Sequence, residues 1–149
     1  MDYKKVYNWF TFDMLVFVGI NAFLLYRFGD RLATLTSIGF YHLLVLGLAA
    51  FRGSNIVSNE VVTKPLRAPF VNEVEKDGKM IEEPKKTGFL GATGVLIYCP
   101  SCTGVWIAAA LAYGYIFWPT VTFFVALILA MSGIERIIAG ILGGLKRTS

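Results

Sequence analysis

Both cysteines of this 149-residue chain lie in one short motif, Cys99-Pro100-Ser101-Cys102. Thiolates attack disulfides and bind metal ions, so the pair is a candidate for either chemistry. Pro100 suits the first position of a helix, because its ring fixes φ and its missing N–H is not needed there. Cys99 would then lie at or near the N-cap, where the helix dipole favours a thiolate. The motif therefore predicts a helix start that carries two thiols.

Three interpretations of this motif stay open. Cys99 and Cys102 can form a redox pair, with Cys102 as the resolving thiol. They can instead bind zinc or another thiolate-bound metal, but a tetrahedral site needs four ligands. The single histidine, His42, is predicted in the middle of a membrane span, so the other ligands would come from a second copy of the chain. In the third interpretation the small residues only let a surface helix turn into the bilayer.

A second candidate segment is Leu66-Arg67-Ala68-Pro69-Phe70. Pro65 and Pro69 disfavour a helical conformation for the residue before each, so we predict a non-helical, ordered stretch. Arg67 is expected to dock on the cytoplasmic ends of the protein's own helices, with Glu60 or the cysteine thiolate as its partner. It could instead bind an anionic lipid headgroup or a partner protein.

These residues must be positioned by membrane helices. The chain is 56% hydrophobic and 16% charged, whereas soluble domains carry about 25% charged residues. Residues 88–118 contain no charge, and one helix of that length would measure about 46 Å. The hydrocarbon core is about 30 Å thick, so we expect a break, and Pro100 is its natural place. The composition predicts an integral membrane protein.

The pattern predicts an all-α polytopic fold with about four transmembrane helices in a single membrane domain, 1–149. Residues 72–87 are expected to form a solvated turn around Asp77-Gly78. The fourth span either continues to about 144 as a tilted helix or ends near Gly133 before a short amphipathic helix. The expected segments are spans at 11–27, 34–51, 101–118 and 120–144, a cytoplasmic loop at 52–87, and an interfacial helix at 88–98.

Lysine and arginine predict the orientation. In this topology twelve of them lie on the side of both termini and the central loop, and two lie on the other side. The positive-inside rule places that richer side, and with it the cysteine motif, in the reducing cytoplasm. Basic residues of the central loop alternate with Glu and Asp, so we expect no nucleic-acid binding.

Two motifs resemble a family of small bacterial integral membrane proteins of unknown function, some of them labelled sporulation proteins. The first runs from Thr63 to Phe70, preceded by Asn59-Glu60-Val61-Val62. The second is the C-P-x-C-x-G-x-W signature, which here includes Gly104 and Trp106. The resemblance covers about residues 35–135 and departs at Asn59-Glu60 and at Tyr98, where members often have Thr. It implies a bacterial inner-membrane location and candidate residues, but no reaction.

The expected role is non-enzymatic: a scaffold or accessory subunit that acts through membrane protein partners or self-association. Leu66, Arg67, Pro69, Phe70, Pro100, Gly104 and Trp106 are then structural or partner-binding residues. One alternative is a membrane thiol protein that binds metal or exchanges disulfides through Cys99 and Cys102. Another is a small channel or transporter subunit that uses Asp13, Asn21 and His42 within the spans. The expected role of these three residues is instead hydrogen bonding between helices.

Overall fold

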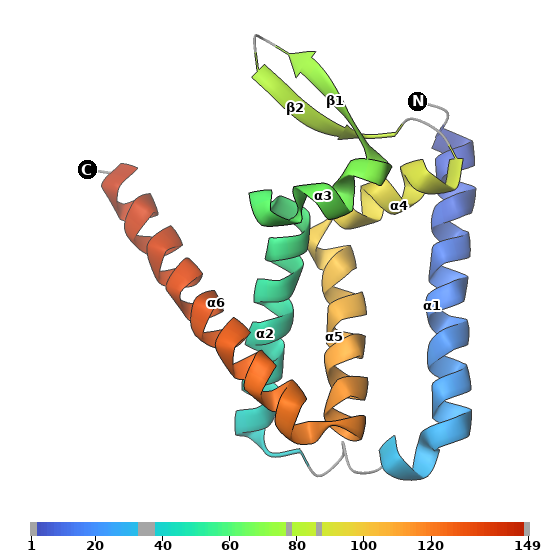
Figure 1. Cartoon of the computed structure of the whole chain (residues 1–149), viewed down its shortest axis with the longest axis vertical. Helices are drawn as coiled ribbons and strands as arrows, with labels where there is room; N and C mark the ends of the chain where they lie inside the picture. The colour runs from blue at the N-terminus through green and yellow to red at the C-terminus, as the bar shows by residue number, and fades with distance from the viewer. Residues whose placement is uncertain (1–2, 33–37, 77–78, 86–87, 148–149) are drawn as a thin grey trace. The chain divides into compact units, whose positions relative to one another are not determined.

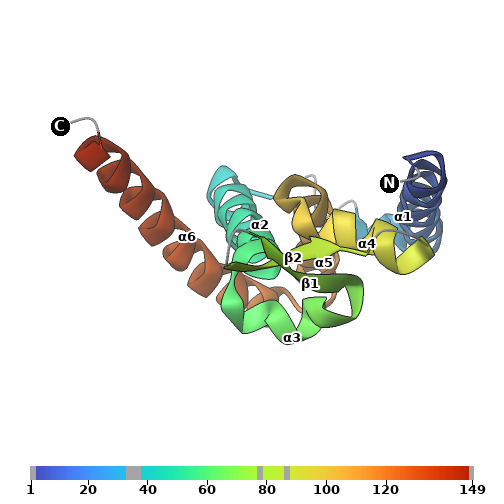
Figure 2. The same ribbon diagram turned by 90° about the horizontal axis from the view of Figure 1, so that it is seen from above.

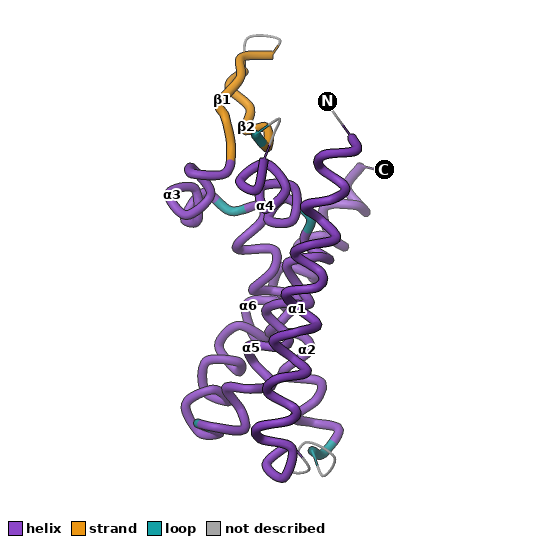
Figure 3. Tube along the Cα trace, turned by 90° about the vertical axis from the view of Figure 1, so that its right-hand side faces the viewer, coloured by secondary structure: helices purple, strands orange, loops and turns teal. Residues whose placement is uncertain are grey.

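Helices account for most of the chain. The computed structural model describes residues 3–32, 38–76, 79–85 and 88–147. Figure 3 shows helix along nearly all of these residues, with strand only in a single hairpin. In chain order the elements are α1 (Tyr3–Leu32), α2 (Phe40–Asn59), η2 (Val61–Thr63), α3 (Lys64–Arg67), η3 (Ala68–Phe70), β1 (Val71–Lys76), β2 (Lys79–Pro84), α4 (Gly88–Tyr98), α5 (Pro100–Phe117) and α6 (Pro119–Arg147) (Figure 1).

Four of these helices are long and apolar enough to cross a membrane, as the sequence predicted. They supply candidate spans at Thr11–Arg31, Phe40–Asn59, Pro100–Phe117 and Pro119–Gly143. The all-α polytopic fold is therefore confirmed. α4 is the shorter apolar helix expected before the cysteine motif. α6 continues without a break past Gly133, which fits the longer of the two predicted fourth spans.

The second helix differs from its predicted bounds. α2 begins at Phe40 and continues to Asn59, whereas the span was predicted over 34–51, of which 34–37 lie outside the described residues. Arg52, Ser54 and other polar residues lower the hydropathy after Phe51 without ending the helix. Hydropathy predicts where a helix leaves the membrane, not where the helix ends. The backbone hydrogen bonds of α2 continue beyond that point, to Asn59. His42 consequently lies in the first turn of α2 and not in mid-span.

The segment after α2 was predicted as a non-helical stretch followed by a solvated turn around Asp77-Gly78. The first prediction is wrong, because Lys64–Arg67 and Ala68–Phe70 are helical. Asp77 and Gly78 lie outside the described residues, between two strands that the sequence did not predict. Lys64 adopts helical φ and ψ (−50° and −46°) although Pro65 follows it. Pro65 and Pro69 each lie in the first turn of a short helical element, where no intrahelical N–H is required. Beyond them β1 and β2 form an antiparallel hairpin that pairs Val71 with Pro84.

The chain divides into two compact units: residues 1–29 with 55–103, and residues 30–54 with 104–149. The second unit has a small apolar core of Val45 and Ala49 from α2 and Ala126 and Ala130 from α6. Small side chains let these two helices approach closely, as is common between membrane helices. Near this core Arg52 Nε donates a hydrogen bond of 2.9 Å to Ser132 Oγ, which satisfies part of an otherwise costly cation.

Within the first unit the hairpin, η3 and α4 pack together. α4 contacts both β2 and η3, and α3 leads through η3 into β1 (Figure 2). An isolated two-stranded hairpin is marginally stable in water, so its attachments to α3 and α4 matter for its order. The first sequence motif supplies α3 and η3, whereas α4 lies just before the cysteine motif.

Candidate functional site

The end of α2 is capped by side chains of the first motif. The last carbonyls of a helix have no intrahelical partner and need donors from elsewhere. Thr63 Oγ1 donates within 2.6 Å of Ile56 O and also lies 2.9 Å from Glu60 O. Arg67 Nη1 donates to Val57 O at 3.0 Å. A cation at a helix C-terminus also interacts favourably with the helix dipole, so Arg67 stabilises the end of α2 in two ways.

The same arginine links α2 to the hairpin and to α4. Arg67 is only 5% exposed, and its Nη2 lies 3.3 Å from Glu82 Oε2 on β2. Tyr98, the last residue of α4, donates its hydroxyl to the same carboxylate. The Arg67 guanidinium also lies 5.7 Å from the centre of the Tyr98 ring. We call Thr63, Arg67, Glu82 and Tyr98 the junction cluster, because it joins three elements through one buried ion pair.

The electrostatics of the junction cluster favour an ionised Glu82 and a neutral Tyr98. The hydrogen bond from Tyr98 lowers the pKa of Glu82, and the charges of Arg67 and Lys64 lower it further against the opposing effect of burial. Burial, together with the hydrogen bond to Glu82, raises the pKa of Tyr98 to about 12. Each group thus holds its partner in the protonation state that the contact requires.

Lys64 resolves a repulsion inside the hairpin. Glu73 and Glu82 lie directly opposite each other on β1 and β2, a destabilising arrangement for like charges. Lys64 Nζ lies 3.1 Å from Glu73 Oε1 and 3.5 Å from Glu82 Oε1, so one cation bridges both carboxylates. These two contacts raise the pKa of Lys64, mainly through Glu73. The hairpin therefore depends on a lysine outside its own strands.

Gly94 lets α4 lie against the chain that precedes the hairpin. A Cβ at this position would lie 2.5 Å from the backbone oxygen of Phe70 and 3.4 Å from Pro84 Cβ. Backbone cannot move aside as a flexible side chain can, so only glycine fits. Ala92, two residues earlier, is fully buried. This contact could not be predicted from the sequence, because glycine is common in membrane helices.

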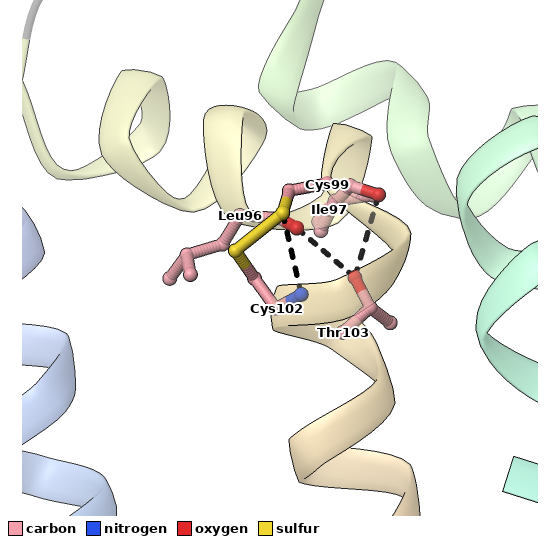
Figure 4. Close-up of a disulfide and its surroundings, with 5 residues drawn as sticks. All are labelled: Leu96, Ile97, Cys99, Cys102 and Thr103. Atoms are coloured by element: carbon pink, nitrogen blue, oxygen red, sulfur yellow. Dashed lines mark hydrogen bonds between the residues drawn. A yellow bond between two sulfur atoms is a disulfide. The ribbon is translucent and has the colours of Figure 1, made fainter. Parts of the chain in front are cut away.

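The cysteine motif forms the corner between α4 and α5. Cys99 and Cys102 form a disulfide with Cα atoms 5.2 Å apart (Figure 4). α5 begins at Pro100, as predicted, which places Cys99 at the N-cap. The Cys102 N–H donates to Cys99 Sγ at 3.3 Å, and the Thr103 hydroxyl donates to Leu96 O at 3.0 Å. The corner is therefore held by a covalent bond and by hydrogen bonds at the ends of both helices.

The metal interpretation gains no further ligands from the structure. Among the described residues no group of three or more His, Cys, Asp and Glu side chains lies close enough to hold an ion. The two sulfurs are bonded to each other and not spread around a shared position. The chemistry that this geometry offers directly is cleavage and formation of the disulfide.

The remaining predicted residues lie in different surroundings. Leu66 and Pro69 are exposed, whereas Phe70 is half-buried beside α4. Gly104 lies in the second unit, where a Cβ would meet Ser54 at an ordinary contact distance of 3.7 Å. Trp106 is partly exposed on α5.

Sequence reasoning missed Glu82, Tyr98, Lys64 and Gly94 as members of this site. Glu82 lies in a charged stretch that the sequence predicted to be solvated. Its partner Arg67 lies fifteen residues earlier, and no sequence pattern predicted the strands between them. Tyr98 stood out as one of several aromatic residues that could anchor a span at the membrane interface, and as a departure from the resembled family. The acidic residue opposite a buried arginine could have been sought, but several candidates lie in the same stretch.

Comparison with known proteins supports a family assignment. The chain is 29% identical over 117 residues to the UPF0713 protein YngL of Bacillus subtilis (strain 168), covering 76% of this chain and 83% of that protein. It is 33% identical over 101 residues to the Sporulation protein YjcA of the same organism, covering 64% of this chain and 86% of that protein. No solved structure matches the chain. Residues 45–142, which include the junction cluster and the cysteine motif, match one family along their whole length, and the chain belongs to that family, described as Protein of unknown function (DUF1360).

Proposed function

We propose that this protein is a non-enzymatic scaffold or accessory subunit of a membrane complex in the bacterial inner membrane. Its termini and the segment that carries the hairpin face the cytoplasm, in accordance with the distribution of lysine and arginine. Its partners are the bilayer and either another membrane protein or a second copy of the chain.

The observation that carries this proposal is an exposed apolar patch on a well-anchored segment. Val61, Val62 and Leu66 are 80%, 74% and 70% exposed, although all three are large aliphatic residues. They flank Thr63 and Arg67, which are buried and bonded to the end of α2. Large apolar side chains that are exposed outside a span are typical of contact with a protein or with the membrane surface. The polar residues of this segment thus anchor it to the end of α2, and its apolar residues remain exposed for a partner to contact.

In-cell crosslinking tests this proposal. A photo-reactive amino acid at Val62 is expected to give a discrete protein adduct, either with a different membrane protein or with a second copy. Leu66→Asp should reduce the adduct strongly, because it places a charge in the patch while leaving the buried anchors in place. Glu75→Gln, on the exposed face of β1, is the control and should leave the adduct unchanged. Adducts with lipid alone would overturn the proposal and make the patch a membrane-surface contact.

A second candidate, thiol–disulfide exchange, is favoured by the disulfide at the helix start. The Cys102 N–H donates to Cys99 Sγ, and a helix N-terminus generally stabilises a thiolate at this position. In the exchange a thiolate of a partner dithiol attacks one sulfur, and the S–S electron pair leaves on the other. The partner's second thiol then displaces the first sulfur, so that the pair is reduced, gains two protons, and leaves a disulfide in the partner. A disulfide on the cytoplasmic side would be of the transient kind.

Alkylation of the protein across a redox titration tests this candidate. A redox-active pair should pass from unreactive to doubly alkylated as the potential falls, and Cys102→Ser should trap a mixed disulfide with a dithiol protein through Cys99. Ser101→Ala is the matched control, because it changes the motif without removing a thiol. Cysteines that stay unreactive toward the alkylating reagent at every potential would refute the exchange. The disulfide would then have only a structural role.

A further inference from the structure

The single histidine of the chain lies in a box of aromatic rings in the second unit. His42 is half-buried in the first turn of α2. Its ring centre lies 4.7 Å from that of Phe123, 5.9 Å from that of Tyr115 and 5.8 Å from that of Tyr41. These rings come from three helices, so the arrangement depends on the tertiary fold of this unit and not on local sequence alone.

The imidazole has ring contacts but no hydrogen bond to any other residue that the structure describes, a set that excludes 33–37. His42 is half-buried at the end of a candidate span, so its imidazole keeps hydrogen-bonding capacity that the described residues do not use. Helix-to-helix hydrogen bonding, the ordinary use of such a residue, is therefore not what His42 does among these residues. Its N–H is left to bond something that enters the box.

An open pocket of 420 Å³ adjoins the imidazole. Aromatic, aliphatic and hydroxyl side chains line it, and no charged residue is among them, so the complementary ligand is neutral. The rings of Tyr115, Phe123 and Phe124 offer stacking surfaces to a flat ring. His42 and Thr120 can donate hydrogen bonds to carbonyl oxygens. The lining residues are His42, Tyr115, Pro119, Thr120, Phe123, Phe124 and Leu127.

The pocket is built from the ends of candidate spans. His42 is in the first turn of α2, Tyr115 is in the last turn of α5, and Thr120 is in the first turn of α6. Span ends lie near the boundary between hydrocarbon and headgroups. A ligand at this depth has its polar ring at the boundary and its apolar tail among the lipids.

We propose that this pocket binds the headgroup of a lipid-soluble quinone, through stacking on the aromatic rings and a hydrogen bond from His42 to a quinone carbonyl. The neutral, flat ring of a quinone fits the uncharged aromatic lining, and its carbonyl oxygens can accept the hydrogen bond of His42. Its isoprenoid tail fits the position of the pocket at the ends of the spans. The proposal concerns binding and does not depend on the scaffold role proposed above.

Tryptophan fluorescence of the purified protein in detergent provides the test. Trp118, 68% exposed and adjacent to Pro119, becomes the sole reporter when Trp9 and Trp106 are replaced by Phe. A naphthoquinone with a short isoprenoid chain should quench it in a saturable manner. His42→Phe retains a ring of similar size but no N–H, so the affinity should fall about tenfold, as expected for one lost hydrogen bond.

Two further variants distinguish a specific loss of binding from misfolding of the His42→Phe variant. Thr120→Val should also weaken binding without changing the aromatic box, and Leu44→Ala, on α2 but outside the lining, should bind as the parent does. Quenching that rises linearly without saturation would overturn the proposal, because it reports partition into the micelle. Equal affinity of His42→Phe and the parent, or full displacement of the quinone by a simple fatty acid, would equally overturn it.

Discussion

Removal of the Arg67 side-chain charge is the sharpest test of how the hairpin is held. Arg67→Met keeps much of the side-chain volume but removes the ion pair to Glu82 and the hydrogen bonds to Val57 and Thr63. Breaking a buried ion pair from one side costs about 3–5 kcal/mol, because the other charge is left uncompensated. Glu82 keeps Tyr98 and Lys64, so we expect the lower end of that range, about 3 kcal/mol.

The loss should appear locally, as faster hydrogen exchange in the hairpin. A cost of about 3 kcal/mol corresponds to exchange faster by roughly a hundredfold in peptides covering residues 71–84. Peptides around Ala126 and Ala130 in the core of the second unit serve as the internal reference and should not change. Mass spectrometry of the detergent-solubilised protein measures both regions in one sample.

A double substitution separates the charge effect from simple loss of packing. Arg67→Met combined with Glu82→Gln removes both members of the ion pair, so no uncompensated buried charge remains. We expect the hairpin of the double variant to exchange more slowly than that of Arg67→Met alone. Unchanged protection in the single variant, or costs that simply add in the double variant, would refute the assignment of Arg67 as the electrostatic anchor.

Three further outcomes are expected from the same site. Gly94→Ala should destabilise the fold by about 1–3 kcal/mol in chemical unfolding, because its Cβ would lie 2.5 Å from a backbone oxygen, whereas Gly104→Ala has ordinary contacts and should be tolerated. Glu82 has a lowered pKa in the folded state, so its contribution to stability is present above its ordinary pKa of 4.5 and is lost as the pH falls through the lowered value; melting temperatures between pH 7 and pH 3 should show this, and Glu82→Gln should flatten that acid limb. Lys64→Met should leave Glu73 and Glu82 facing each other without the cation that bridges them, although Glu82 keeps its contact with Arg67. Hairpin exchange should therefore accelerate at low salt and less so at high salt.

The cysteine corner shows how far local sequence rules reach. Pro100 has one favourable place in a helix, so the start of α5 and the N-cap position of Cys99 followed from the motif alone. The same rules failed for Pro65 and Pro69, which lie in the first turns of short helical elements. The restriction on the residue before a proline is a preference of modest size. Capping contacts from Thr63 and Arg67 to the end of α2 outweigh it here.

The sequence by itself determined that the chain enters a membrane, that four helices are long enough to cross it, and where α5 begins. These properties depend on residues that are adjacent in the chain, because hydropathy and proline geometry act over one helix at a time. Only the tertiary structure decided that Arg67 meets Glu82 and Tyr98, that Lys64 lies between two opposed glutamates, and that Gly94 contacts the backbone at Phe70. Those partners are far apart along the chain, and the two strands of the hairpin carry charged residues at half of their positions. Which charge is buried depends on the register of the strands and on packing against α4, and neither is encoded in any single segment.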